Sequence, residues 1–73
     1  MIESGWYAAQ WREGQRAVVL ECIVPGDGVL CREDRPDAPW RMDRPLGVMV
    51  GPFDTRTHAQ HEAARMNREE ANA

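Results

Sequence analysis

A strand-to-helix junction decides the fold of this chain: Leu46-Gly47-Val48-Met49-Val50-Gly51-Pro52-Phe53-Asp54-Thr55, followed by a run of helix-forming residues. The apolar run 46–50 predicts a buried strand, whose shared face would carry Leu46, Val48 and Val50. Gly51-Pro52 is expected to stop that strand, because proline lacks a backbone donor. Polar residues after Phe53 offer N-caps for a helix. The chain is therefore expected to end as a helix lying across a small sheet.

The helix is expected over residues 56–68. Ala59, Ala63 and Met66 recur at helical spacing and form a narrow apolar stripe. Alanine lets a helix approach a sheet closely, although it buries little area. His58 and His61 are interpreted as exposed helix residues, the alternative being a pH-sensitive or ligand-sensitive role.

Two further strands are expected upstream of the junction. Residues 5–12 alternate, which places Tyr7, Ala9 and Trp11 on one face. Residues 16–24 form the strongest strand pattern, with one face made of Val18, Leu20, Cys22 and Val24. Gly14 lies in the link between them, so the two runs predict a β-hairpin. With residues 46–51 added, the sequence predicts an α+β fold: a three-stranded antiparallel sheet with one C-terminal helix packed on it.

Residues 25–45 are expected to be a loop in which 29–32 could form a short additional strand. Pro36 and Pro39 exclude regular structure around them. A long loop inside a compact domain is either functional or mobile. This one carries Trp40 among acids and arginines, and two interpretations of that side chain remain open. It could fold down as a lid over the core, or it could anchor a partner.

The length of 73 residues indicates a single domain spanning 1–73. Its longest apolar runs are far shorter than the ~20 residues that a membrane span requires. The start, Met1 to Trp6, has an early acid and no basic region, so no secretory signal is expected. We therefore expect a cytoplasmic protein that does not associate with membranes.

All nine basic residues are arginine, and the formal net charge is −3. Acids and arginines interleave along the chain without a basic stripe, so affinity for nucleic acid driven by counterion release is not expected. Arginine and tryptophan both suit protein interfaces. The composition favours a protein partner over direct nucleic-acid binding.

No catalytic or metal-binding motif is recognisable. Cys22 is interpreted as a small buried apolar residue and Cys31 as a loop thiol. A disulfide would need an oxidising compartment. A zinc site would need two more ligands, and His58 and His61 lie far along the chain. We therefore expect no enzymatic activity, no cofactor and no metal.

The chain resembles small RNA-polymerase-binding regulators of lytic phages of xanthomonads. The likeness rests on the start Met1-Ile2-Glu3-Ser4-Gly5-Trp6, the aromatic hairpin and the lysine-free composition, and it covers the whole chain by length and layout. It implies binding to the largest subunit of host RNA polymerase, in the host cytoplasm. Such regulators inhibit transcription initiation and act as antiterminators.

Two other likenesses are local. The junction at residues 51–56 resembles the ends of peptidoglycan-binding repeat domains, which are exported. The hairpin with its closing helix resembles the arm-binding domains of phage integrases, which are basic. The alternative function is accordingly a small nucleic-acid-binding module of a phage or mobile element.

The partner surface is expected on the loop, at Glu33, Asp34, Asp37, Trp40 and Asp43. Its acids would complement a basic partner and speed encounter, while the tryptophan would supply most of the binding energy. The second choice is the first strand, around Glu3, Trp6 and Tyr7. We expect the protein to act as a monomer.

Overall fold

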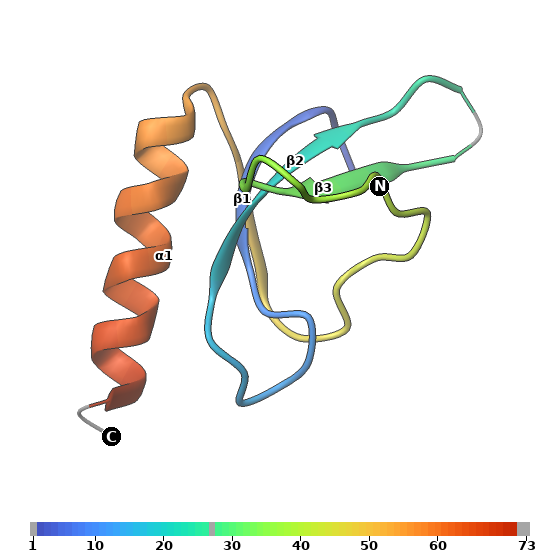
Figure 1. The fold of residues 1–73 in the computed structure, drawn as a ribbon. Helices are drawn as coiled ribbons and strands as arrows, with labels where there is room; N and C mark the ends of the chain where they lie inside the picture. The colour runs from blue at the N-terminus through green and yellow to red at the C-terminus, as the bar shows by residue number, and fades with distance from the viewer. Residues whose placement is uncertain (1, 27, 72–73) are drawn as a thin grey trace.

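The computed structural model describes residues 2–26 and 28–71 (Figure 1). Its elements in chain order are β1 (Gly5–Ala9), β2 (Val18–Ile23), β3 (Leu30–Glu33), β4 (Met49–Phe53) and α1 (Arg56–Ala71). The strands form one sheet in the order β3-β2-β1-β4, and every neighbouring pair is antiparallel. The α+β class and the antiparallel hairpin are confirmed. The described sheet, however, has four strands, so the prediction of three was wrong.

The additional strand is β3, in the stretch that the sequence left open. It pairs with β2 so that Cys22 lies opposite Cys31 and Ile23 opposite Leu30. Cys31 is completely buried there, so its interpretation as a loop thiol was wrong. Pairing with β2 explains the burial, because β3 extends the apolar face of its neighbour.

The last strand is shifted along the chain relative to the prediction. β4 runs through Gly51-Pro52 to Phe53 instead of ending at Gly51. It lies at the sheet edge, where a proline is tolerated. Gly51 has φ of 145°, and a Cβ atom there would lie 2.7 Å from Cδ2 of Tyr7. The glycine thus lets the edge strand pass close to the Tyr7 ring.

The shift in β4 leaves two predicted strand residues outside the sheet. Leu46 and Val48 precede β4 and are 85% and 49% exposed. Their expected burial on one face with Val50 was therefore wrong. The first two strands are also shorter than expected, covering 5–9 and 18–23.

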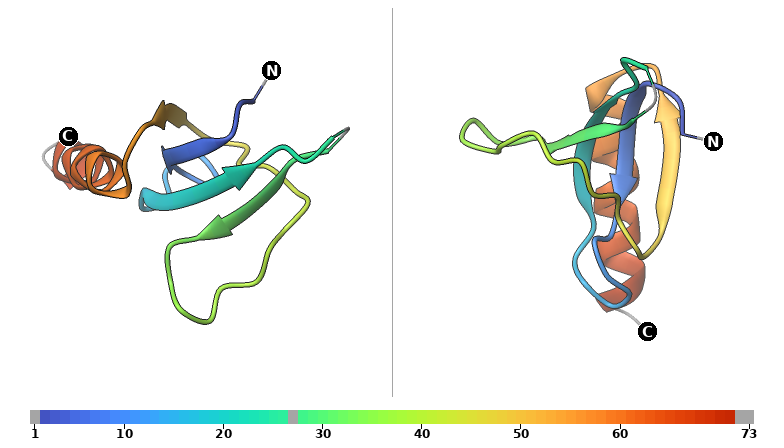
Figure 2. Two further views of the ribbon diagram at one scale, coloured as in Figure 1. Left: turned by 90° about the horizontal axis from the view of Figure 1, so that it is seen from above. Right: turned by 90° about the vertical axis from the view of Figure 1, so that its right-hand side faces the viewer.

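The two faces of the sheet bury different side chains. On one face, α1 packs through the predicted stripe, with Ala59 and Ala63 buried and Met66 half-buried. The other face buries a second cluster, the loop-side core, which is made of Tyr7, Ala9, Leu20, Cys22 and Cys31. Figure 2 shows the helix on one side of the sheet and the segment that leads to β4 on the other. The fold therefore has two small cores separated by one sheet.

Specific polar contacts cap the helix and hold it beside the start of β2. Thr55 caps its start, where its Oγ1 accepts a hydrogen bond from the N–H of His58 at 3.1 Å. Near the other end, Asn67 accepts from the N–H of Ala17 at 2.7 Å and donates to its carbonyl oxygen at 3.1 Å. His58 and His61 are both exposed, as expected.

Candidate functional site

The segment between β3 and β4, residues 34–48, is called the β3–β4 loop here. Main-chain hydrogen bonds hold it against the sheet at two places. Near its middle, the N–H of Cys31 donates to the carbonyl of Arg41 at 2.8 Å, and the N–H of Arg41 donates back at 2.7 Å. Near its end, the N–H of Leu46 donates to Trp11 and the N–H of Gln10 donates to Val48. The loop is long but has a defined path.

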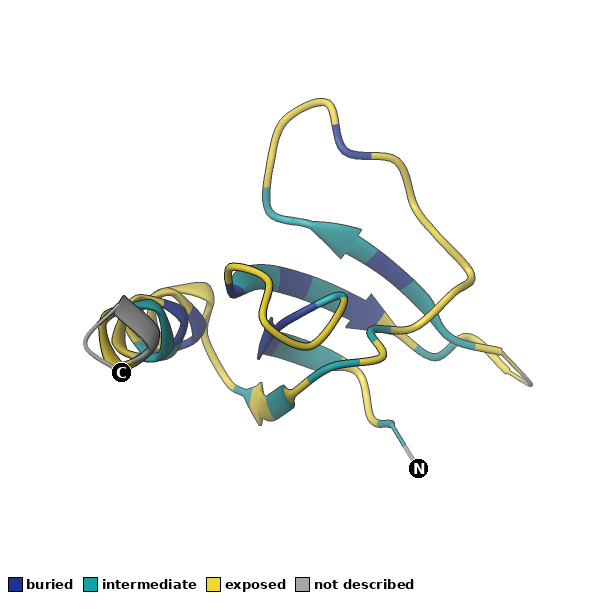
Figure 3. Cartoon of the chain, turned by 90° about the horizontal axis from the view of Figure 1, so that it is seen from below, coloured by how far each residue is buried: buried dark blue, intermediate teal, exposed yellow. Residues whose placement is uncertain are grey.

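Exposed apolar side chains gather on this loop. Among the described residues, five large hydrophobic side chains are exposed, and four belong to the loop: Trp40 (41%), Met42 (81%), Leu46 (85%) and Val48 (49%). The fifth is Ile23 at the end of β2. Figure 3 shows the predominantly exposed path of the loop. Scattered exposed apolar residues are ordinary, but their concentration on one constrained segment marks a candidate contact surface.

Trp40 lies at the surface and stacks on an arginine. The guanidinium of Arg32 sits 5.0 Å from the ring centroid, which is a cation–π geometry. The loop residue that is buried is Ala38, and the tryptophan that packs against the loop-side core is Trp11. Arg41 lies over the Trp11 ring at 4.1 Å. This exposure counts against Trp40 as a buried lid over the core, and its role as a partner anchor stays a prediction.

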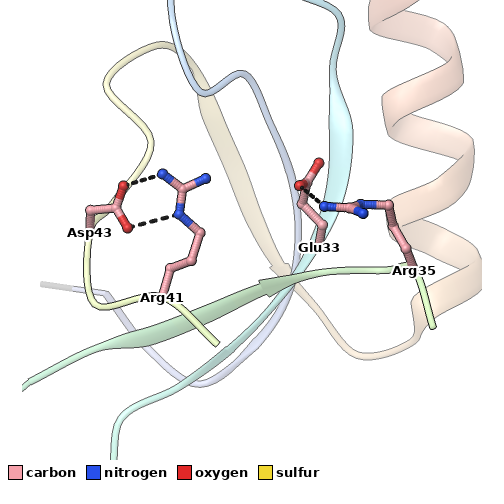
Figure 4. A network of polar contacts seen from close by, with 4 residues as sticks. All are labelled: Glu33, Arg35, Arg41 and Asp43. Carbon is pink, nitrogen blue, oxygen red and sulfur yellow. Dashed lines mark hydrogen bonds and ion pairs between the residues drawn. The ribbon is translucent and has the colours of Figure 1, made fainter. Parts of the chain in front are cut away.

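Three of the four acids predicted for the site are paired with arginines. Glu33 binds Arg35 at 3.0 Å, and Asp43 accepts hydrogen bonds from Arg41 at 3.0 and 2.6 Å (Figure 4). These hydrogen bonds from Arg41 hold the pKa of Asp43 below its usual value. The charges of Glu33 and Asp43 are therefore compensated within the protein.

The third paired acid is Asp34, and the fourth acid is Asp37. Asp34 accepts from Nε of Arg56 at 2.7 Å and from Gln60 at 3.4 Å, so it ties the start of the loop to α1. Asp37 is exposed and has no ion pair within the part of the chain that the structure describes. Electrostatic attraction to a basic partner is accordingly weaker than four free carboxylates would provide.

The second-choice surface does not come together as one face. Tyr7 is only 4% exposed, and its hydroxyl donates to the carbonyl of Glu3 at 2.6 Å. Burial raises the pKa of Tyr7, and the ring belongs to the loop-side core. Trp6 is half-buried and lines a shallow hollow of about 360 Å³ with Glu21 and Phe53. Tyr7 is thus a core residue that anchors the N-terminal segment.

Sequence reasoning missed the exposed side chains of Met42, Leu46 and Val48. Two signals were present, since Pro45 and Gly47 flank Leu46 and both weaken a strand. Gly47 is closely packed, and a Cβ atom at this position would lie 2.8 Å from the carbonyl oxygen of Gln10. This close approach holds the end of the loop on the turn that follows β1.

No metal-binding cluster of three or more His, Cys, Asp or Glu side chains is present within residues 2–26 and 28–71. Over the same residues, α1 does not have the length and apolar character that a bilayer-spanning helix needs. Comparison of the chain with protein-family models, curated proteins and solved structures found no match.

Proposed function

We propose that this protein is a non-enzymatic cytoplasmic regulator whose β3–β4 loop binds host RNA polymerase. In this proposal the complex inhibits transcription initiation and promotes antitermination, and the largest polymerase subunit supplies the contact. The proposal of a polymerase rests on the resemblance to phage regulators. The proposal of a protein-binding loop rests on the concentration of exposed apolar side chains on a segment that is held in place.

The constraint on the loop matters as much as its exposed residues. A binding segment that is already held in place loses less conformational entropy when it binds. Here the main-chain bonds of Arg41 and Leu46 hold the segment between them, and this segment carries Met42. Exposed apolar side chains that gather on one segment mark interaction surfaces, and tryptophan, which this loop carries at Trp40, is enriched among the residues that dominate binding energy.

The second candidate is a nucleic-acid-binding module, and one feature supports it. A hollow of about 310 Å³ is lined in part by Trp11, Arg12, Arg41 and Arg44. Arginines beside an aromatic ring suit phosphates and stacked bases. Against it, Arg41 is already engaged by Asp43, and the chain carries a net charge of −3.

A polymerase pull-down with matched variants tests the proposal. The test variant is Met42→Ser combined with Leu46→Ser, and the control is Ile23→Ser, which changes the exposed apolar residue outside the loop. We expect the double variant to lose at least ~10-fold in affinity, equivalent to about 1.4 kcal/mol. The control should bind like wild type.

Two results would count against the proposal. Unchanged polymerase retention by the double variant would remove the loop from the interface. Tight duplex binding with a steep salt dependence, together with no polymerase retention, would favour the nucleic-acid module.

Trp40→Ala separates the two interpretations of that residue. As an anchor, Trp40 should contribute at least ~2 kcal/mol to binding, with the thermal midpoint nearly unchanged. As a core lid, its loss should lower the free energy of unfolding by ~3–5 kcal/mol and reduce binding only through unfolding.

A further inference from the structure

The binding surface leaves the cysteine pair without a role. Cys22 and Cys31 are 1% and 0% exposed, and their Sγ atoms lie 3.1 Å apart. They face each other across β2 and β3, directly opposite in the strand register. Both are free thiols in this structure.

The hydrogen bonds around Cys31 show which kind of cross-strand pair this is. Both main-chain groups of Cys31 point away from β2, because they bond to Arg41 on the other side of β3. Cys22 and Cys31 therefore occupy a non-hydrogen-bonded position of the antiparallel ladder. Opposed residues at such positions have Cα atoms about 4.5 Å apart, with side chains closer than at hydrogen-bonded positions. That separation lies within the range that disulfides span, about 4.4–6.8 Å.

We propose that Cys22 and Cys31 are a reversible redox pair that forms an intramolecular disulfide by exchange with a low-molecular-weight disulfide of the glutathione type. The thiolate of one cysteine attacks a sulfur of the external disulfide, forms a mixed disulfide and expels one thiolate. The second cysteine gives up its proton and attacks the protein sulfur of the mixed disulfide, which expels the second thiolate. The protein loses two electrons and two protons, and the external disulfide is reduced to two thiols.

Burial makes this exchange slow, whereas the strand register, which sets the two sulfur atoms side by side, favours its product. Burial raises the pKa of Cys22, and the hydrogen bond with Cys31 raises it further, so little thiolate is present at neutral pH. Exchange therefore waits for β3 to open. This strand has only four residues and lies at the edge of the sheet, so its local opening costs less than global unfolding. When β3 closes again, the register brings the two sulfur atoms together.

The disulfide would also stiffen the β3–β4 loop. Two main-chain hydrogen bonds join Cys31 to Arg41 in the middle of the loop. A disulfide between Cys22 and Cys31 would therefore link β2 to that part of the loop. Opening of β3 is then opposed by a covalent link, and the hydrogen bonds to Arg41 should break less often. This inference goes beyond the proposed function and holds whatever partner the loop binds.

Equilibration of the full chain in glutathione redox buffers tests the proposal. Samples with and without denaturing urea are quenched with acid, alkylated and read by mass spectrometry. If the fold brings the thiols together, the equilibrium constant for the Cys22–Cys31 disulfide should be at least ~10-fold larger in the folded chain than in urea, which corresponds to about 1.4 kcal/mol. An equal or smaller constant in the folded chain would overturn the proposal, as would a predominance of mixed disulfides or of disulfide-linked dimers.

Amide hydrogen exchange gives a second readout on the same wild-type protein. The amide of Arg41 should exchange more slowly after oxidation, because it bonds to the carbonyl of Cys31. The amide of His58, which bonds to Thr55 at the start of α1, serves as an internal control and should not change. Equal exchange at Arg41 in the two redox states would refute the link between the disulfide and the loop.

Discussion

Four glycines allow backbone strain and steric crowding to be measured separately in this protein. Gly26 has open space and no left-handed backbone, whereas Gly14 has open space and φ of 84°. Gly47 is crowded without a left-handed φ, and Gly51 is both crowded and left-handed. Alanine should therefore add neither penalty at Gly26 and backbone strain alone at Gly14. It should add steric crowding alone at Gly47 and both penalties at Gly51.

The expected magnitudes follow from the geometry. Gly26→Ala should be neutral or stabilising by about 0.4–1 kcal/mol, because it restricts the unfolded chain. Gly14→Ala should cost about 1–2 kcal/mol through its left-handed backbone. Gly47→Ala should cost about 1–3 kcal/mol, because its new Cβ atom would lie 2.8 Å from a carbonyl oxygen that belongs to the main chain.

Gly51→Ala should be the most damaging of the four. Its Cβ atom would lie 2.7 Å from Tyr7 Cδ2 and 2.9 Å from the carbonyl oxygen of Trp6. Backbone strain of about 1–3 kcal/mol adds to steric cost of about 1–3 kcal/mol, giving about 2–6 kcal/mol. A chain of this length has only about 4–11 kcal/mol of stability in total.

Urea unfolding followed by tryptophan fluorescence measures the series, with trimethylamine N-oxide added equally to all samples to keep the weakest variant folded. The order of stability should be Gly26→Ala, Gly14→Ala and Gly47→Ala, with Gly51→Ala last. If Gly51→Ala is as stable as Gly26→Ala, the close passage of β4 over the Tyr7 ring is incorrect. The path of the edge strand would then have to be rejected.

Three further predictions concern single side chains. Asn67→Ala should lower the free energy of unfolding by about 2–4 kcal/mol, because it removes both hydrogen bonds to buried Ala17. Urea unfolding measures this change, and a loss below about 0.5 kcal/mol would contradict the prediction. The pKa of Asp43 is lowered in the folded state, so its stabilising effect is complete above the unfolded-state pKa and is lost as the pH falls through the folded one. The difference in urea midpoint between wild type and Asp43→Asn should therefore be present at neutral pH and shrink below pH 3.8, and a difference independent of pH would refute the pairing. Arg65→Ala, which removes exposed ion pairs to Glu62 and Glu69, should change stability by less than about 1 kcal/mol, and a larger loss would show that these pairs are more than a surface network.

Local patterns predicted the parts of the fold that local interactions determine. The stripe of Ala59, Ala63 and Met66 is visible at helical spacing, and these residues do face the sheet. The hairpin of β1 and β2 is likewise encoded by alternation and a glycine-containing link. Both depend on residues that are close together in sequence.

The existence of β3 and the bounds of β4 depend on pairing between segments that are distant in sequence, so local patterns could not predict them. β3 exists because it completes the free edge of β2, and its own four residues give too short a pattern to identify. β4 continues through Gly51-Pro52 because it lies at the sheet edge, where proline is tolerated, and because glycine lets it pass close to the Tyr7 ring. The local sequence of β3 or of β4 does not indicate that its partner is β2 or the Tyr7 ring.

In the candidate site too, contacts between residues close in sequence were predictable and contacts between distant segments were not. The pairings of Glu33 with Arg35 and of Arg41 with Asp43 join residues two apart, and the interleaved charges were visible in the sequence. The contact of Asp34 with Arg56 crosses from the loop to the helix and could not be predicted from spacing. The exposure of Leu46 likewise depended on where β4 begins.

The position of β1 inside the sheet sets the order in which the protein can assemble during synthesis. β1 to β3 leave the ribosome first, and each pairs with its neighbour along the chain. The other edge of β1 and its helix-facing side stay uncovered until β4 and α1 are synthesised. An open strand edge on a nascent chain invites pairing with other chains. A nascent polypeptide arrested before Met49 is therefore expected to aggregate or be degraded, and synthesis of residues 49–71 is the step that commits the chain to its fold.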